Sequence, residues 1–382
     1  MGLSHPLLCL HFVADRELNP EGLLIGFGDG DTDLLLPLNT CPDFLALPAA
    51  LPCFVDPTAR TLPPGLLNEL LDAGFQLPAE NSVHRSDETS RPTLPPTAQW
   101  LSGDWYLAPP AKAVGNQTTS RALALKLVQL VAADADTREI EDIFRRDPLL
   151  AYHLLRLVNS VGMGPGKRIS SFSQAILILG RQQLKRWLNL LLFAASKDDH
   201  RAAMLLARAG VRARSMELLA SAAGLDKAEQ EQAFMAGMFS LLGVLFGMPL
   251  PEILQPLHLS DGLNRSLLER EGETGQLLLA LTAAEHADSL ALAELLPGLR
   301  VAPDEFNQIN IKAHRWILGV IHGKRINVFS INNTPVFDMH IYDMFANGII
   351  ILPGTLFFIW GIPPYIVMEN RIAGVVYEFQ RR

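Results

Sequence analysis

The pattern of apolar and polar positions divides the chain into three regions. Between residues 116 and 321, apolar residues recur every three or four positions, and the breaks between these periodic runs are short. This spacing predicts an all-α body of about 200 residues. Residues 1–115 mix short apolar runs with Gly and Pro, and predict a small, irregular α+β region. Residues 322–382 follow neither pattern, so the fold class expected is mainly α with an unassigned C-terminal tail.

The N-terminal region contains signals for both strands and helix. "GLLIGFGDG" (22–30) and "DLLLPLN" (33–39) predict two strands joined by an acidic turn. "LPPGLLNELLDAGF" (62–75) predicts a helix, because Pro lies near its start and Gly near its end. Residues 82–97 are polar and contain Pro, and predict a loop.

The helical body is expected to contain eleven helical segments. Asp147 is a predicted N-cap, Pro148 occupies the first helical position, and Gly180 ends a later helix. The predicted segments are 120–133, 136–146, 147–159, 170–180, 181–195, 201–224, 229–247, 251–257, 264–272, 274–296 and 304–321.

The C-terminal 61 residues, 322–382, differ in composition from everything before them. Residues 344–368 carry no charge and are long enough to span a bilayer, but Pro353, Pro363 and Pro364 interrupt any single helix. "INVFSINNTPVFDMHIYDMF" (326–345) is compatible with a hairpin around an Asn-Asn turn. A natural domain, a membrane segment and a reading frame extended into foreign DNA are the alternatives for this tail.

Charge is distributed unevenly along the chain. Residues 145–214 hold 13 Lys or Arg and three acids, a local charge of +10 in a chain whose net charge is −8. This asymmetry indicates either an anionic partner or an acidic surface elsewhere in the protein. Three cysteines without a CxxC pair and an N-terminus without a secretory signal favour a reduced, cytoplasmic protein.

Several stretches resemble chemical motifs without completing them. Gly162, Gly166 and Lys167 approach a phosphate-binding loop, but the spacing is one residue short and no strand is expected before them. His286 and Asp288 lie near each other, but the chain has no adjacent His-Asp pair. These departures predict no metal and no cofactor, and they favour a turn between two packed helices for residues 162–167.

Residues 170–193 read as helix, glycine turn, helix, which is also the order of a DNA-reading helix-turn-helix. Arg181, Lys185 and Arg186 would lie on its second helix. That helix continues into Trp187 and a run of Leu, which indicates burial and argues against nucleic acid as a partner.

"DIFRRDPLLAYHLLRLVNS", a glycine loop, "ISSFSQAILILG" and "LKRWL" together resemble the HDOD domain, a bacterial signalling module related in fold to His-Asp phosphohydrolases. The resemblance covers about residues 123–321. "SGDWYLAPP" (102–110) is similar to the last strand of an EAL-type cyclic-di-GMP phosphodiesterase domain. About 115 residues are too few for the α/β barrel of that domain, and no Glu-Ala-Leu occurs, so the resemblance implies a shortened, degenerate EAL-like region.

The resemblance implies a non-catalytic signal-transduction protein whose HDOD domain docks other signalling proteins. The alternatives are a metal-dependent cyclic-nucleotide phosphohydrolase, and a binder of anionic ligands or nucleic acid through residues 145–214. The predicted interaction surface consists of Lys167, Arg168, Arg181, Lys185 and Arg186. The opposing interpretation is that these cations are solvated or pair with acids such as Glu229, Glu231 and Glu285. The predicted structural motif consists of Asp147, Pro148, Asn159, Ser160, Gly180 and Trp187.

Overall fold

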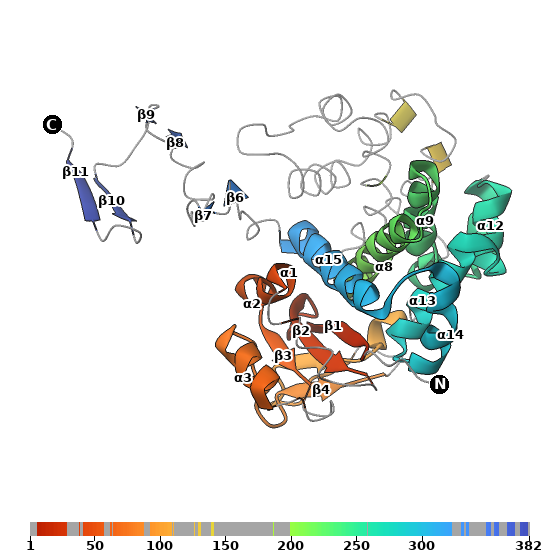
Figure 1. Cartoon of the computed structure of the whole chain (residues 1–382), viewed down its shortest axis with the longest axis horizontal. Coiled ribbons are helices and arrows are strands. Elements are labelled where there is room, and N and C mark those ends of the chain that lie inside the picture. Colours follow the sequence, from red (N-terminus) through yellow and green to blue (C-terminus); the bar gives the residue numbers. More distant parts are fainter. Residues whose placement is uncertain are drawn as a thin grey trace. The chain divides into compact units, whose positions relative to one another are not determined.

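The computed structural model describes most of the N-terminal region and of the second half of the helical body (Figure 1). The described residues are 6–28, 41–56, 64–87, 92–108, 199–257 and 259–322, with single positions between these ranges and short strands beyond residue 329. The chain divides into two compact units, residues 1–323 and 324–382. Most predicted helices before residue 199 lie outside the described residues.

The N-terminal region is built on a five-stranded mixed sheet with the order β3-β2-β1-β5-β4. Strands β1 (Leu8–Ala14) and β2 (Pro20–Phe27) pair antiparallel, from Leu8 opposite Phe27 to Ala14 opposite Pro20. The shorter strands are β3 (Cys53–Val55), β4 (Val83–Arg85) and β5 (Trp100–Ser102); β2 with β3 and β4 with β5 pair parallel.

Two N-terminal predictions are confirmed and one is wrong. β2 overlaps the predicted strand 22–30 from residue 22 to residue 27, and α3 (Pro64–Asp72) lies in the predicted helix 62–75, with Leu66 and Leu70 fully buried. The predicted loop 82–97 instead begins with β4, because backbone pairing with β5 holds Val83, His84 and Arg85 in a strand that no alternating apolar pattern predicted. The predicted strand 33–39 lies outside the described residues, apart from Leu38. The remaining short elements are α1 (Pro42–Leu45), α2 (Leu47–Ala50) and the 3₁₀ helix η2 (Trp105–Leu107).

Two long helices form the centre of the described helical body. They are α8 (Ala202–Ala222) and α9 (Lys227–Phe239). α9 begins with a capping box, in which the Asp226 carboxylate accepts from the Glu229 N–H and the Glu229 carboxylate accepts from the Asp226 N–H. The predicted helix 229–247 is in fact two helices, because the chain turns at Ser240 and Leu241 before α10 (Leu242–Phe246).

The helices after α10 follow the predicted order. They are α11 (Leu250–Leu254), the 3₁₀ helix η3 (Gln255–Leu257), α12 (Asp261–Leu268), α13 (Gly272–Glu285), α14 (Ser289–Leu299) and α15 (Pro303–His322). The single helix predicted over 274–296 breaks between α13 and α14. Ala287 adopts a positive φ of 55°, and the Asp288 carboxylate caps α14 by accepting from the Ala291 N–H at 3.0 Å.

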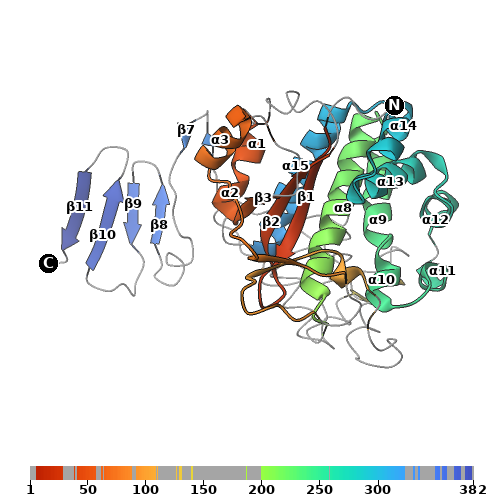
Figure 2. The same cartoon turned by 90° about the horizontal axis from the view of Figure 1, so that it is seen from below.

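Glycines allow α8 to pack closely against helices on two sides. A Cβ on Gly237 of α9 would lie 2.7 Å from the Arg212 carbonyl oxygen of α8, and a Cβ on Gly210 of α8 would lie 2.2 Å from Ile317 Cδ1 of α15. α15 also packs against β1, and Figure 2 shows it between the sheet and α8. The N-terminal and helical residues form one hydrophobic core. The prediction of a mainly helical protein preceded by a small α+β region is therefore confirmed.

The second unit contains three antiparallel strand pairs. They are β6 (Ser330–Ile331) with β7 (Thr334–Pro335), β8 (Ile349–Leu352) with β9 (Thr355–Phe358), and β10 (Tyr365–Asn370) with β11 (Val375–Gln380). The first pair flanks the Asn-Asn dipeptide of the predicted hairpin. Among the residues that the structure describes, no helix combines the length and the apolar character needed to cross a bilayer.

Candidate functional site

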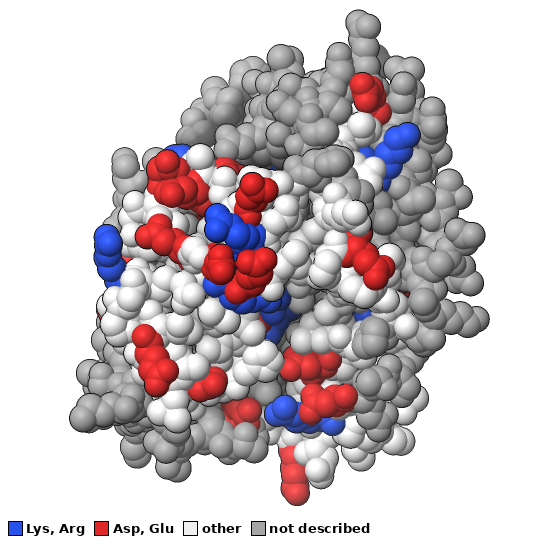
Figure 3. All heavy atoms as spheres, turned by 90° about the vertical axis from the view of Figure 1, so that its right-hand side faces the viewer, with Lys and Arg blue, Asp and Glu red and all other residues white. Residues whose placement is uncertain are grey.

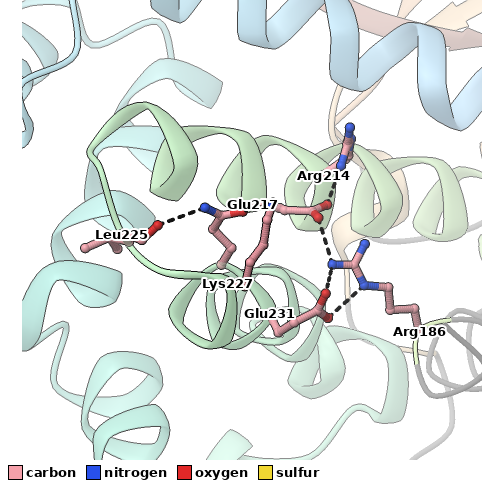
Figure 4. Close-up of polar contacts among 7 residues, drawn as sticks. Arg186, Arg214, Glu217, Leu225, Lys227 and Glu231 are labelled. Atoms are coloured by element: carbon pink, nitrogen blue, oxygen red, sulfur yellow. Dashed lines mark hydrogen bonds and ion pairs between the residues drawn. The ribbon is translucent and has the colours of Figure 1, made fainter. Parts of the chain in front are cut away.

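Arg186 is the residue of the predicted interaction surface that the structure describes. Its Nε donates to Glu231 Oε2 at 2.8 Å, and its Nη2 donates to Glu217 Oε1 at 2.7 Å (Figure 4). The guanidinium carbon also lies 4.6 Å from the centre of the Phe234 ring, a cation–π distance. The side chain is 13% exposed. Arg186 therefore binds acids of α8 and α9. Its pairing with Glu231 agrees with the opposing interpretation, in which the cations of the predicted surface pair with acids of the same chain.

The other predicted site residues lie outside the described residues. They are Lys167, Arg168, Arg181 and Lys185 of the interaction surface, and Asp147, Pro148, Asn159, Ser160, Gly180 and Trp187 of the structural motif. The roles assigned to them remain predictions.

Acids within and beyond the basic segment balance its described cations. Five of the 13 cations between residues 145 and 214 belong to the described residues, and all five form ion pairs. They are Arg186, Arg201, Arg208, Arg212 and Arg214, and their partners are Asp199, Glu217, Glu231 and Glu285. Figure 3 shows the described acidic and basic side chains interspersed on one face of the molecule. For these five arginines, the charge asymmetry reflects internal pairing.

Two of these ion pairs share one buried carboxylate, that of Glu285 at the end of α13. Arg208 Nη2 lies 3.1 Å from Glu285 Oε2, and Arg212 Nε donates to Glu285 Oε1 at 3.0 Å. Arg212 Nη1 also donates to Ser240 Oγ at 2.8 Å. Burial alone would raise the pKa of Glu285, but the two guanidinium groups outweigh it and lower that pKa to about 2. Glu285 is therefore ionised at neutral pH and joins α13 to α8.

A small cavity, lined by both apolar and polar residues, lies beside this cluster. Its volume is about 30 Å³, and its walls come from β1, α8, α13 and α15. Polar groups reach it from Cys9, His11, Arg208, Glu285, Asn310 and His314. A cavity of this size accommodates about one or two water molecules. It is too small for a nucleotide, so it is not a substrate pocket for a cyclic dinucleotide.

Both histidines of the cavity are neutral at physiological pH. Burial, followed by the positive charge of Arg208, lowers the pKa of His11 to about 4. Burial also lowers the pKa of His314 to about 4, although hydrogen bonds to the backbone of Asn310 and Leu10 oppose the shift. His314 Nδ1 lies 2.9 Å from the Asn310 carbonyl oxygen. Each ring therefore provides one N–H donor and one acceptor nitrogen.

The described residues do not form a metal site. No three His, Cys, Asp or Glu side chains within the described ranges converge as ligands. Burial raises the pKa of the Cys9 thiol to about 11, so this thiol is protonated at neutral pH. His286 is exposed and its Nδ1 lies 2.8 Å from the Thr282 carbonyl oxygen, while Asp288 caps α14. These two residues shape a helix junction.

The cluster around Glu285 and the cavity histidines were not predicted from the sequence. Glu285 lies more than 70 residues from both Arg208 and Arg212, so no local pattern joins the carboxylate to the two arginines. One signal was available on α15: Asn307, Asn310 and His314 are polar at spacings of three and four on one helix face.

The family comparison agrees with the helical body. Residues 119–271 match the model of the HDOD domain. The predicted HDOD domain is therefore confirmed. No comparison reports an EAL-like domain in the N-terminal region.

Two curated proteins are similar to about half of this chain. The cyclic di-GMP phosphodiesterase CdgJ of Vibrio cholerae is 32% identical over 197 residues, which cover 51% of this chain and 45% of the relative. The uncharacterised protein YuxH of Bacillus subtilis is 26% identical over 200 residues, covering 52% and 48% respectively. The chain thus spans about half the length of the curated relatives that it matches.

A solved structure, of a presumed phosphohydrolase from Shewanella amazonensis, matches with a TM-score of 0.39 at 16% identity. The match covers 53% of this chain and 93% of the solved chain. At this level of similarity the match carries no argument about activity.

The comparison with CdgJ corrects the expected function. A relative at 32% identity is named as a phosphodiesterase, so the expectation of a non-catalytic docking protein that is not an enzyme is wrong. That expectation depended on missing motifs, namely Glu-Ala-Leu and an adjacent His-Asp pair. A missing motif does not exclude a catalytic site, because distant residues can converge in the fold. The similarity to CdgJ favours the phosphohydrolase alternative.

Proposed function

We propose that this chain is a phosphohydrolase that acts on cyclic di-GMP. The single observation that carries the proposal is the 32% identity over 197 residues to a protein named as a cyclic di-GMP phosphodiesterase. The HDOD match over residues 119–271 supports it, because the helical body resembles a module related in fold to His-Asp phosphohydrolases.

The proposal places the chemistry away from the cavity beside Glu285. That cavity is too small for the substrate, and Arg208 and Arg212 are already bound to a carboxylate. The described residues also supply no set of metal ligands. A metal-dependent reaction would therefore use ligands outside the described ranges, and we assign no catalytic residue among the described ones.

The reaction is the addition of water to one phosphodiester bond. A P–O3′ bond breaks, the water oxygen becomes bonded to phosphorus, and a proton passes to the departing 3′ oxygen. The product is a linear dinucleotide with one 5′-phosphate. Cyclic di-GMP is itself anionic, so the proposal retains the anionic partner that the charge distribution suggested.

The experiment is to incubate the full chain with cyclic di-GMP and Mn²⁺ or Mg²⁺ and to quantify the linear product by reversed-phase chromatography. We expect product to increase linearly with time and with protein concentration, and to stop when a chelator is added. A mock purification from cells without the gene gives the background. Product at the background rate with either metal would contradict the proposal.

We further propose that residues 1–115 are a shortened, EAL-like region with a regulatory role in cyclic-di-GMP signalling. The support is the similarity of residues 102–110 to the last strand of an EAL domain; in the structure β5 ends at Ser102 and the 3₁₀ helix η2 follows. Because no Glu-Ala-Leu occurs, we assign hydrolysis to the HDOD body. Calorimetric titration of the full chain with a non-hydrolysable cyclic di-GMP analogue tests whether the two regions hold one site or two. If the titration finds a single site whose affinity is unchanged by the W105A substitution in η2, the result would argue against a role for residues 1–115.

A cytoplasmic location, suggested by the three free cysteines, and binding to other signalling proteins also remain proposals. Separating cell extracts into soluble and membrane fractions tests the location, and a pull-down with the full chain tests the partners.

A further inference from the structure

Strand β1 is fully paired along one edge only. On the side of β2 its pairing runs from Leu8 to Ala14. On the side of β5, the described pairing is between Ala14 and Leu101. Backbone groups alternate in direction along a strand, so Leu8 and Leu10 direct their N–H and C=O groups toward the same edge. That edge is the one that β5 does not reach.

Three polar side chains of α15 cover this edge. Asn307 Oδ1 accepts from the Leu8 N–H at 2.8 Å, and Asn307 Nδ2 donates to the Pro6 carbonyl oxygen at 2.8 Å. Asn310 Nδ2 donates to the Leu8 carbonyl oxygen at 2.8 Å. His314 forms a further hydrogen bond with the backbone of Leu10. We call Asn307, Asn310 and His314 the α15 row.

The spacing of the α15 row matches that of the strand. Residues 307 and 314 are separated by about 10.5 Å along a helix, at about 1.5 Å per residue. Residues 6 and 10 are separated by about 13 Å along a strand, at about 3.3 Å per residue. Because the helix runs in the same direction as β1, successive side chains of the row reach successive backbone groups of the edge. The row therefore takes the place of a strand partner.

The α15 row provides hydrogen bonds to backbone N–H and C=O groups at this edge, which apolar contacts alone would leave unsatisfied. Asn307 is 3% exposed and His314 is 4% exposed, and a buried amide or imidazole is tolerated only when it is hydrogen-bonded. An ion pair between Arg315 and Asp43 joins the same helix to α1. On its other side α15 packs on α8 through Ile317 and Gly210, so it lies between the sheet and the helical body (Figure 2).

We propose that the α15 row is a latch, which holds the N-terminal sheet on the helical body and can open while α8 and α9 remain folded. Opening breaks the bonds of Asn307, Asn310 and His314 to the edge of β1. It frees that edge, and it also removes the β1 wall, Leu8 to His11, from the cavity containing Arg208 and Glu285. The latch does not depend on the proposed hydrolysis of cyclic di-GMP.

Hydrogen exchange of the full chain, followed by mass spectrometry, tests the latch. Asn307→Leu removes both amide bonds and keeps a side chain of similar volume. Its matched control is Asn68→Leu on α3, where the asparagine is exposed. We expect N307L to accelerate exchange in peptides covering residues 6–14 at least tenfold, while peptides of α9 change less than twofold. N68L should change neither.

Two results would overturn the latch. Unchanged exchange of residues 6–14 in N307L would show that the row does not hold the strand. Equal acceleration in β1 and α9 would show that the sheet and the helices open together. If N307L does not fold, the wild-type chain decides: β1 amides should lose protection at a lower urea concentration than α9 amides, and coincident loss contradicts the proposal.

Discussion

The two cavity histidines should make the protein less stable in mild acid. A histidine in the unfolded chain has a pKa near 6.5, whereas burial lowers the pKa values of His11 and His314 to about 4. Between these values the unfolded chain binds protons that the folded chain excludes. The stability from neutral burial is therefore fully present above pH 6.5 and is lost as the pH falls from 6.5 toward 4.

The magnitude follows from the size of the shifts. Each pKa unit corresponds to about 1.4 kcal/mol, so one histidine shifted from 6.5 to about 4 contributes about 3.4 kcal/mol in full. Between pH 7 and pH 5 the loss from His314 is about 2 kcal/mol. His11 is less completely buried and adds up to a similar amount. Glu285 does not contribute in this range, because its pKa of about 2 places its loss below pH 4.5.

Burial sets the direction of this effect, and the charged groups around the two rings modify its size. Arg208 on α8 disfavours the protonated form of both histidines, while Glu285 on α13 and Asp104 favour protonated His11. Arg85 on β4 also disfavours protonated His11. Burial is the largest cause for both rings, so protonation remains unfavourable in the folded chain.

Urea denaturation at pH 7 and pH 5 measures the effect. The wild-type chain should lose about 2 to 4 kcal/mol of unfolding free energy between these pH values, and His314→Gln should lose about 2 kcal/mol less than the wild type. His286→Gln is the matched control, because His286 also bonds through Nδ1 to the carbonyl four residues before it but is exposed. If H314Q and the wild type show the same dependence on pH, the reasoning is refuted.

Two further substitutions test the packing of the helical body. Glu285→Gln leaves two buried arginines without their carboxylate and should lower the unfolding free energy by about 3 to 5 kcal/mol. The control is Glu294→Gln, at an exposed position, which should change the unfolding free energy by less than about 0.5 kcal/mol. Equal effects of the two substitutions in urea denaturation would contradict the role assigned to Glu285. Gly237→Ala places a Cβ 2.7 Å from a backbone oxygen of α8 and should lower the melting temperature by several degrees. The control is Gly262→Ala, because a Cβ on Gly262 meets nothing within 4 Å; this substitution should leave the melting temperature unchanged or raise it. A calorimetric scan in which both glycine variants melt together would argue against the close approach of α8 and α9.

Local patterns predicted the parts of the fold that depend on local sequence. The apolar spacing located α8 and α15 within two residues of their ends, and Pro and Gly bounded α3. The HDOD resemblance was read from turn residues and spacing, and the family match confirms it.

Other features depend on contacts between distant residues, and no local pattern reveals them. β4 is a strand because it pairs with β5, although two of its three residues, His84 and Arg85, are polar. The helix predicted over 274–296 breaks where Asp288 caps a new helix, and its apolar spacing continues through the break.

The same limit applies to the candidate site. The positive charge of residues 145–214 was visible in the sequence, but the acids that balance its described arginines come from residues 199, 217, 231 and 285. A charge count along the chain does not distinguish an internal ion pair from a free surface cation. The expectation of a non-enzyme failed for a related reason, since it treated the absence of short motifs as the absence of chemistry.

Hydrolysis in water enriched in ¹⁸O tests the central claim most directly. The full chain is incubated with cyclic di-GMP and Mn²⁺, and the products are weighed by mass spectrometry. The account predicts a linear dinucleotide that carries one ¹⁸O in its 5′-phosphate and whose formation requires the metal. Intact cyclic di-GMP after prolonged incubation with stoichiometric, folded protein would contradict it.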